Sequence, residues 1–310
     1  MFDFDILLQQ ILNGLVLGSV YALIALGYTM VYGILQLINF AHGEVLMVGA
    51  MVAAWLVPML LAAGVPAPLA LLLVVLAAIP VCMALGFTIE RIAYRPLRNA
   101  PRLAPLITAI GVSIVLQQLA MIFWGRNYHA FPPILPTSSR EIGGAHITDV
   151  QIVIILLAVA IMAGLMLLVN RTRLGRAMRA TAENPQIAGL MGVNINVIIS
   201  ATFLIGSALA AVAGVMVSAN YSIAHYHMGF ILGLKAFTAA VLGGIGNLPG
   251  AMLGGVLLGL IESLGAGYIG DLTGGFLGSH YQDVFAFFVL ILVLVFRPSG
   301  LMGEKVAERA

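Results

Sequence analysis

The stretch "RATAENPQIAGLMGVN", Arg179 to Asn194, is polar and lies between two long apolar runs. Asn184 followed by Pro185 is typical of a helix start, because Asn caps the first turn and Pro fits the first helical position. Gly192 suits the position just beyond the end of such a helix. The sequence therefore predicts a short helix here, of about seven residues or roughly 10 Å.

This predicted helix is too short to be stable alone in water, so it needs a partner surface. Ile187, Leu190 and Met191 fall on one of its faces, at i, i+3 and i+4 spacing. One interpretation is that this apolar face lies on the membrane-facing surface of the same chain. The other is that the face contacts a different protein.

The composition indicates that the surrounding runs are solvated by lipid. The chain has 310 residues, of which 62% are hydrophobic and 8% are charged, and its mean hydropathy is +1.09. Soluble domains contain about 25% charged residues. We therefore expect residues 1–310 to form a single membrane domain. The N-terminal stretch "MFDFDILLQQ" has no Lys or Arg, so we interpret the first apolar run as a retained span rather than a cleaved signal peptide.

The apolar runs predict an all-α, polytopic membrane bundle of about eight or nine transmembrane helices. About 20 apolar residues cross the hydrocarbon core as a helix, and "AAGVPAP" and "GGIGNLPG" divide the longer runs as turns. The expected spans begin near residues 8, 45, 67, 103, 150, 197, 230, 250 and 281. The last is marginal, since its uncharged part, Val284 to Phe296, is 13 residues long. Eight spans with a re-entrant segment are the alternative.

The basic residues orient the chain, because cytoplasmic loops are enriched in Lys and Arg. In a nine-span arrangement 11 of the 14 basic residues share one side: Arg91, Arg95, Arg98, Arg102, Arg171, Arg173, Arg176, Arg179, Arg297, Lys305 and Arg309. The other side receives Arg126 and Arg140, and Lys235 lies near a span end. This pattern predicts an N-terminus outside the cytoplasm, a cytoplasmic C-terminus and a cytoplasmic loop at about 171–196 that contains the short helix; in a bacterial inner membrane the N-terminus would be periplasmic.

Several stretches resemble the branched-chain amino acid permeases of ABC importers. One is the stretch "RATAENPQIAGLMGVN" quoted above. The others are "GYTMVYGILQLINFAHGE", "ERIAYRPLRNA", "PLITAIGVSIVLQ" and "GGIGNLPGAMLGGVLLGLIESL", and the matches occur in family order from near residue 10 to near residue 300. The resemblance implies a binding-protein-dependent permease of the bacterial inner membrane. Its short loop helix would dock in a cleft of a cytoplasmic ATPase and transmit ATP-driven movement to the spans.

The same resemblance implies the partners and the coupling residues. The assembly would contain a second, related permease chain, two ATPase chains and a periplasmic amino-acid-binding protein. The sequence contains no G-x-x-x-x-G-K-[ST] phosphate loop, so we expect ATP and Mg²⁺ to bind in the partner subunits, with no cofactor on this chain and no enzymatic activity of its own. The expected coupling positions are Glu183, Asn184, Pro185, Gly189 and Gly192.

Polar residues within the apolar runs are candidates for the translocation pathway or the bundle interface, since ionisable groups are costly in the bilayer. These candidates are Asn39, His42, Glu44, Gln117, Asn247 and Glu262. "INFAHGEV" is either a broken helix whose backbone lines the route or a solvated cytoplasmic turn. Glu262 is either a pathway residue or a carboxyl paired within the bundle. For Gln117 and Asn247 we favour structural hydrogen bonding over contact with substrate.

Two further patterns restrict the function. Small residues at helical spacing over 206–214 and 243–259 favour close helix packing in lipid. His225 and His227 alone are weak evidence for a metal site, and we assign none.

The alternatives to a branched-chain permease are a permease of the same type for urea or short amides and an ion-coupled secondary transporter. The second would need buried acid–base pairs, for which Glu262 is the strongest candidate.

Overall fold

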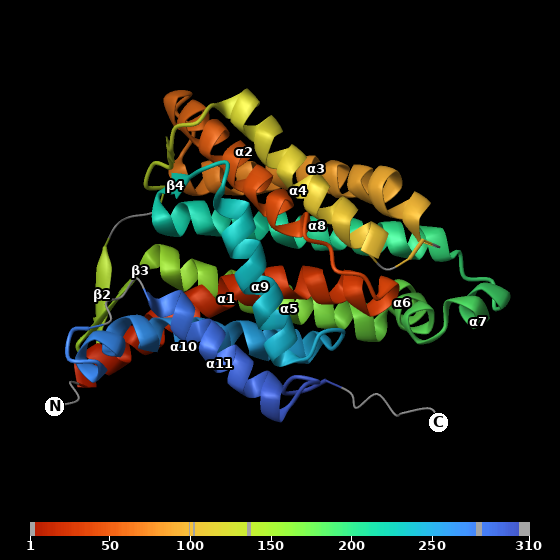
Figure 1. The fold of residues 1–310 in the computed structure, drawn as a ribbon. Helices are drawn as coiled ribbons and strands as arrows, with labels where there is room; N and C mark the ends of the chain where they lie inside the picture. Colours follow the sequence, from red (N-terminus) through yellow and green to blue (C-terminus); the bar gives the residue numbers. More distant parts are fainter. Residues whose placement is uncertain (1–3, 99, 102, 135–137, 277–280, 304–310) are drawn as a thin grey trace.

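The computed structural model describes residues 4–98, 100–101, 103–134, 138–276 and 281–303. Three of the basic residues used to orient the chain, Arg102, Lys305 and Arg309, lie outside the described residues. Figure 1 shows a helical bundle in which the axes of most helices are roughly aligned, in either chain direction. The prediction of an all-α membrane bundle is confirmed.

In the described part of the chain, nine apolar helices begin within a few residues of the predicted starts. They are α1 Phe4–Leu35, α2 His42–Ala62, α3 Ala67–Ile89, α4 Leu103–Trp124, α5 Asp149–Arg171, α8 Ile195–Tyr221, α9 Met228–Gly243, α10 Leu248–Leu272 and α11 Gln282–Phe296. Seven of the nine are long and apolar enough to cross a membrane, whereas α9 has 16 residues and α11 has 15. The number of complete spans therefore stays a prediction.

The helices form two layers with α1 and α8 at the centre. In Figure 1 one layer contains α2, α3, α4 and α8, the other contains α1, α5, α10 and α11, and α9 crosses in front of both. The most apolar stretches of α1 and α8 are 89% and 67% buried, whereas those of α3, α4 and α5 are each 28% buried. The latter three helices therefore present most of their side chains to the outside of the bundle.

Small residues allow α1 and α10 to pack closely, as the sequence predicted. A side chain at Gly255 would collide with the backbone of Ala22, and one at Gly259 would collide with the backbone of Gly18. The same holds between α8 and α2, where Gly214 packs on the carbonyl of Leu46. Backbones this close gain van der Waals contact that larger residues would prevent.

One end of the bundle carries two short antiparallel ladders. β1 His129–Ala130 pairs with β4 Ile223–Ala224, and β2 Ser139–Ile142 pairs with β3 Ala145–Thr148. The first turns of α1 are tied to the same end, because the side chain of Gln9 donates to the carbonyl of His146 at 3.0 Å and accepts from its amide at 2.7 Å.

The opposite end carries the short helices η1 Glu90–Tyr94, η2 Arg95–Leu97, α6 Arg173–Glu183 and α7 Pro185–Leu190. The α9–α10 turn lies beside α6, since Gly246 and Met178 line one small cavity. Met302 joins this end through its carbonyl, which accepts from Asn247 at 3.0 Å. The three groups of basic residues, as far as they are described, therefore share one end of the molecule, as expected.

Candidate functional site

The polar loop after α5 contains two helices rather than the single one predicted. In α6 the hydroxyl of Thr172 caps the first turn by accepting from the amide of Gly175 at 3.0 Å. Arg179 donates to the carbonyl of Val169 at 2.6 Å and so fixes α6 to the end of α5. Met178 and Thr181, on the inner face of α6, are buried. The signal for α6 was an apolar stripe opposite arginines, which sequence analysis treated only as loop charge.

Helix α7 has the predicted local structure. The side-chain oxygen of Asn184 accepts from the amide of Ile187 at 3.0 Å, and Pro185 occupies the first helical position. The helix is six residues long and ends at Leu190, with Met191 as its C-terminal cap. Gly192 follows with φ of +88°, a left-handed conformation that glycine adopts without strain.

The apolar face of α7 is exposed. Leu190 is 87% and Met191 is 81% accessible, and Ile187 is also exposed. In Figure 1 the helix projects from the far end of the bundle. The interpretation that this face lies on the chain's own membrane surface is therefore wrong, because within α7 only Ala188 is buried. Glu183 and Asn184 are exposed beside it, and space is open around Gly189.

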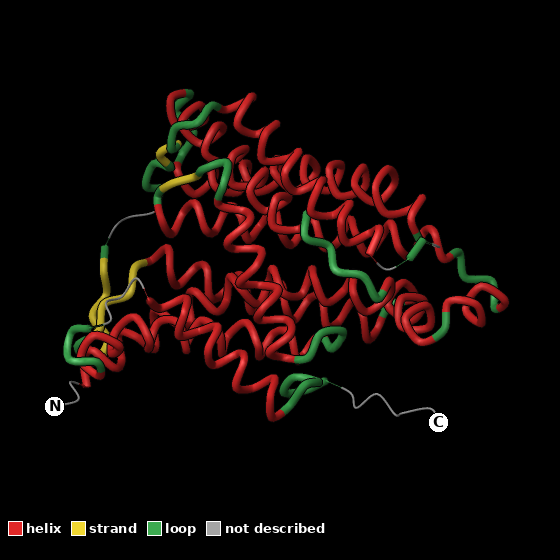
Figure 2. The backbone as a smooth tube through the Cα atoms, in the orientation of Figure 1, coloured by secondary structure: helices red, strands yellow, loops and turns green. Residues whose placement is uncertain are grey.

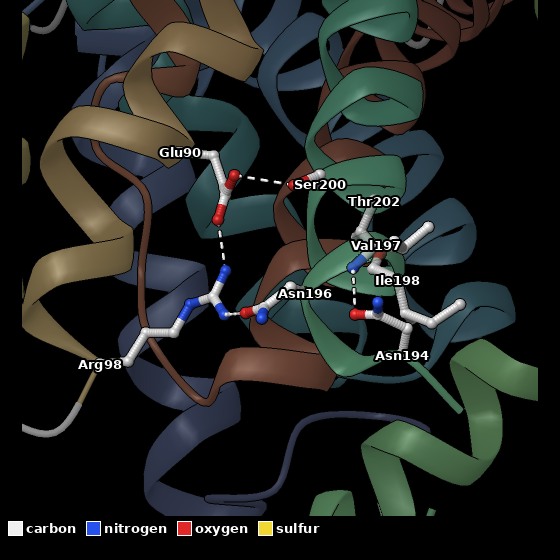
Figure 3. A network of polar contacts seen from close by, with 8 residues as sticks. All are labelled: Glu90, Arg98, Asn194, Asn196, Val197, Ile198, Ser200 and Thr202. Atoms are coloured by element: carbon white, nitrogen blue, oxygen red, sulfur yellow. Dashed lines mark hydrogen bonds and ion pairs between the residues drawn. The ribbon is translucent and has the colours of Figure 1, made fainter. Parts of the chain in front are cut away.

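A buried polar network anchors the element that follows α7. Glu90, which is 0% accessible, accepts from Arg98 and, at 2.8 Å, from the hydroxyl of Ser200. Arg98 also donates to the side chain of Asn196 at 2.5 Å. Figure 3 shows how these groups join the end of α3 to the first turns of α8, where Asn194 caps Val197. The sequence patterns above did not predict this network, although an acid at the end of an apolar run was a signal for it.

The same end of α3 holds the break between α1 and α2. The hydroxyl of Tyr94 lies 3.2 Å from the carbonyl oxygen of Ile38 and 3.1 Å from the side-chain oxygen of Asn39, which also accepts from the amide of Ala41. Figure 2 shows residues 36–41 as a loop that runs from the end of α1 in one layer to the start of α2 in the other. The π-helical turn η1 contains both Glu90 and Tyr94, so it contacts α8 and this loop at once.

His42 and Glu44 begin α2 deep inside the bundle. His42 packs edge-on against the ring of Tyr28 at 4.8 Å between centroids, and Glu44 is 0% accessible. One oxygen of Glu44 accepts from Ser113 at 2.9 Å and from Gln117 at 2.7 Å. Since Gln117 lies about 21 Å along α4 from its start, Glu44 is at membrane depth. The solvated-turn interpretation is therefore wrong, because "INFAHGEV" runs from a partly buried loop into the buried start of α2. That its backbone lines the route stays a prediction.

A cavity of about 460 Å³ lies between α1, α4, α9 and the 36–41 loop, and two of its lining residues, Ser113 and Gln117, are the partners of Glu44. We call it the α4–α9 cavity. Its walls are formed by Tyr28, Phe40, Ile110, Ser113, Ile114, Gln117, His227, Phe230 and Leu234. Ser113 and Gln117 are buried, whereas the apolar residues from α4 and α9 are exposed on the outside of the chain. Of the predicted pathway candidates, Gln117 therefore borders this cavity, and Glu44 lies directly behind it.

Glu262 is paired within the bundle, which was one of the two alternatives. Its two oxygens contact the hydroxyl of Tyr21 at 2.9 Å and the ammonium of Lys235 at 2.7 Å. Lys235 also lies 2.7 Å from Asp283 of α11. Lys235 is thus an inward-facing residue of α9 rather than a residue near a span end, and sequence analysis missed both of its ion pairs.

The remaining candidates have structural contacts. Asn247 caps α10 by accepting from the amide of Gly250 at 2.9 Å. The ring of His225 stacks on Tyr128 at 4.3 Å, and His227 faces the α4–α9 cavity. Within the part of the chain that the structure describes, no three His, Cys, Asp or Glu residues are grouped as a metal site would need.

Comparison with known proteins gives one consistent result. A family model described as "Branched-chain amino acid transport system / permease component" matches residues 10–294. The high-affinity branched-chain amino acid transport system permease protein BraD of Pseudomonas aeruginosa is 49% identical over 97% of both chains. LivH of Escherichia coli K12, with the same description, is 44% identical over 97% of both chains. A probable branched-chain amino acid permease of Methanocaldococcus jannaschii is 28% identical over 95% of this chain and 92% of its own length. No solved structure matches.

Proposed function

Because the chain belongs to the branched-chain amino acid transport permease family, we propose that it moves leucine, isoleucine and valine across the inner membrane as the passive permease subunit of an ATP-driven importer. It is a multi-pass membrane protein and a transport subunit, not an enzyme. The observation that carries the mechanism is the exposed apolar face of α7, with Leu190 87% accessible. Such a face on a capped, projecting helix fits the cleft of a motor subunit.

Movement of α7 has a direct route into the membrane helices. α7 is followed by α8 after only residues 191–194. Asn196 and Ser200 of α8 bind Arg98 and Glu90, so a shift of α8 also displaces the end of α3. Tyr94 then connects that end to the loop before α2. These contacts support the proposal that α7, α8, α3 and the broken start of α2 move as a linked set.

The proposed assembly contains a second, related permease chain, two cytoplasmic ATPase chains and a periplasmic amino-acid-binding protein. ATP and Mg²⁺ would bind in the ATPase chains. The grouping of described arginines at the α6–α7 end supports placing that end in the cytoplasm and the start of α1 in the periplasm. Glu183, Asn184, Pro185, Gly189 and Gly192 would then meet the ATPase.

The test is substrate uptake into proteoliposomes that contain the assembled importer. With ATP inside and loaded binding protein outside, labelled leucine should accumulate, whereas urea and acetamide should not. The same permease pair without its ATPase should not accumulate leucine on a proton or sodium gradient. Accumulation driven by such a gradient would overturn the proposal and point to Lys235 and Glu262 as an ion-coupling pair. Accumulation of urea in place of leucine would overturn the substrate assignment.

A further inference from the structure

The α4–α9 cavity combines a polar wall and an apolar wall. Ser113 and Gln117 form the polar wall, and both donate to the same oxygen of Glu44, at 2.9 and 2.7 Å. The apolar part of the lining is aliphatic and aromatic and includes Ile114 of α4 and Phe230 of α9. The volume of about 460 Å³ falls in the range of about 300–1,000 Å³ that small-molecule sites occupy.

Among the described residues, Glu44 is a buried acid without a basic partner. Its second oxygen, Oε2, has no hydrogen-bond partner among the described residues and faces the backbone of Gly229 in α9. None of the ion pairs between described residues includes Glu44. This differs from Glu90 and Glu262, which each have a cation within contact distance. A buried carboxylate is costly unless a cation or several donors compensate it, so the site favours a cationic group nearby.

On the basis of the function proposed above, we propose that the α4–α9 cavity is a transient binding site for the transported amino acid. Ser113 and Gln117 line the cavity and donate hydrogen bonds to Glu44 behind them. The negative potential of Glu44 attracts the α-ammonium group to this wall. The apolar wall receives the branched side chain, whose burial there is favourable. The site selects for an ammonium group next to a compact apolar side chain, which is the part of the molecule that all three substrates share.

The cavity is open on the outside of this chain, which fits weak and brief binding. Ile114 is 53% accessible, and Phe230 and Leu234 are also exposed. In Figure 1 α4 and α9 lie on the same side of the bundle. A second permease chain on this side would close the cavity, so the complete site would form between the two permeases.

The test is protection of a cysteine placed in the cavity wall. The assembled importer carrying Ile114→Cys would be treated with a membrane-permeant thiol reagent, since the native Cys82 is buried. Three probes would compete: leucine, 3-methylbutylamine, which keeps the ammonium, and 4-methylpentanoate, which lacks it. Leucine and 3-methylbutylamine should slow the modification, and 4-methylpentanoate should need roughly tenfold higher concentration or more, as expected for loss of a charged hydrogen-bonding partner.

Two variants complete the experiment. Ile122→Cys, on the same helix, 72% accessible and outside the cavity, should show no protection by any probe. E44Q combined with Ile114→Cys should abolish the preference for the ammonium compounds. If E44Q fails to assemble, the comparison of the three probes on Ile114→Cys alone still decides the point.

The outcomes separate this site from the proposed function. Equal protection by 4-methylpentanoate and leucine would overturn the role of Glu44. Absence of protection at Ile114→Cys, while the unsubstituted importer accumulates leucine with ATP, would overturn the site and leave the proposed function intact. An unsubstituted importer that accumulates no branched-chain amino acid would contradict the proposed function itself.

Discussion

Arg98 is the residue that compensates the buried charge of Glu90. The Glu90 carboxylate has no accessible surface and has two side-chain donors, Arg98 and Ser200. A buried charge that loses its cationic partner costs about 3–5 kcal/mol. Arg98 therefore contributes to the stability of the junction between α3 and α8.

We predict that Arg98→Ala destabilises the permease by about 3 kcal/mol, since Glu90 would be left buried with only Ser200 as a donor. The measurement is thermal unfolding of the purified permease in detergent. Arg91→Ala is the matched control, because Arg91 is an exposed arginine in the same π-helical turn, and it should leave the unfolding temperature unchanged. Equal effects of the two substitutions would show that the buried pair does not stabilise the junction.

Glu183 lies exposed at the end of α6, immediately before α7. We predict that Glu183→Lys lowers ATP-driven uptake roughly tenfold, because charge reversal at a docking surface opposes association, while the importer subunit still folds and inserts. Glu141→Lys, an exposed substitution of the same kind at the opposite end of the bundle, is the control. Undiminished uptake in the Glu183 variant would remove this residue from the coupling surface.

At the scale of the elements, the contact between α1 and α10 is made by glycines on both helices. We predict that Gly255→Ile lowers the unfolding temperature sharply, since the new side chain would collide with the backbone of Ala22 and overpacking costs about 1–3 kcal/mol or more. Gly164→Ile in α5 is the control, because the space around Gly164 is open. Similar unfolding temperatures for the two variants would mean that the helices do not depend on this close approach.

The helices themselves were largely predictable from sequence. Hydropathy sets where each apolar helix lies, and local capping chemistry placed the start of α7 at Pro185. Helix α6 was missed because its arginines indicate a loop when charge alone is considered. Its apolar stripe, which includes Met178, is short and has meaning only once α1 is known to lie beneath it.

At the scale of the whole molecule, the buried polar contacts could not be read from the chain. Lys235, Glu262 and Asp283 lie on three different helices and come together only when these pack. For the same reason the sequence left two meanings open for Glu44, since its burial depends on α4 and α9. What sequence could supply was the list of polar residues within apolar runs, and that list included Glu44, Gln117 and Glu262.

The shortness of α11 has a consequence for the lipid around the protein in the predicted nine-span arrangement. Its 15 residues measure about 22 Å, less than the roughly 30 Å of hydrocarbon in a typical bilayer. Val284 and Val295, near its two ends, are both exposed. A bilayer crossing by α11 would require the acyl chains beside this edge to compress, at a modest elastic cost. Such a crossing would couple membrane thickness to the energy of the fold at one edge of the permease.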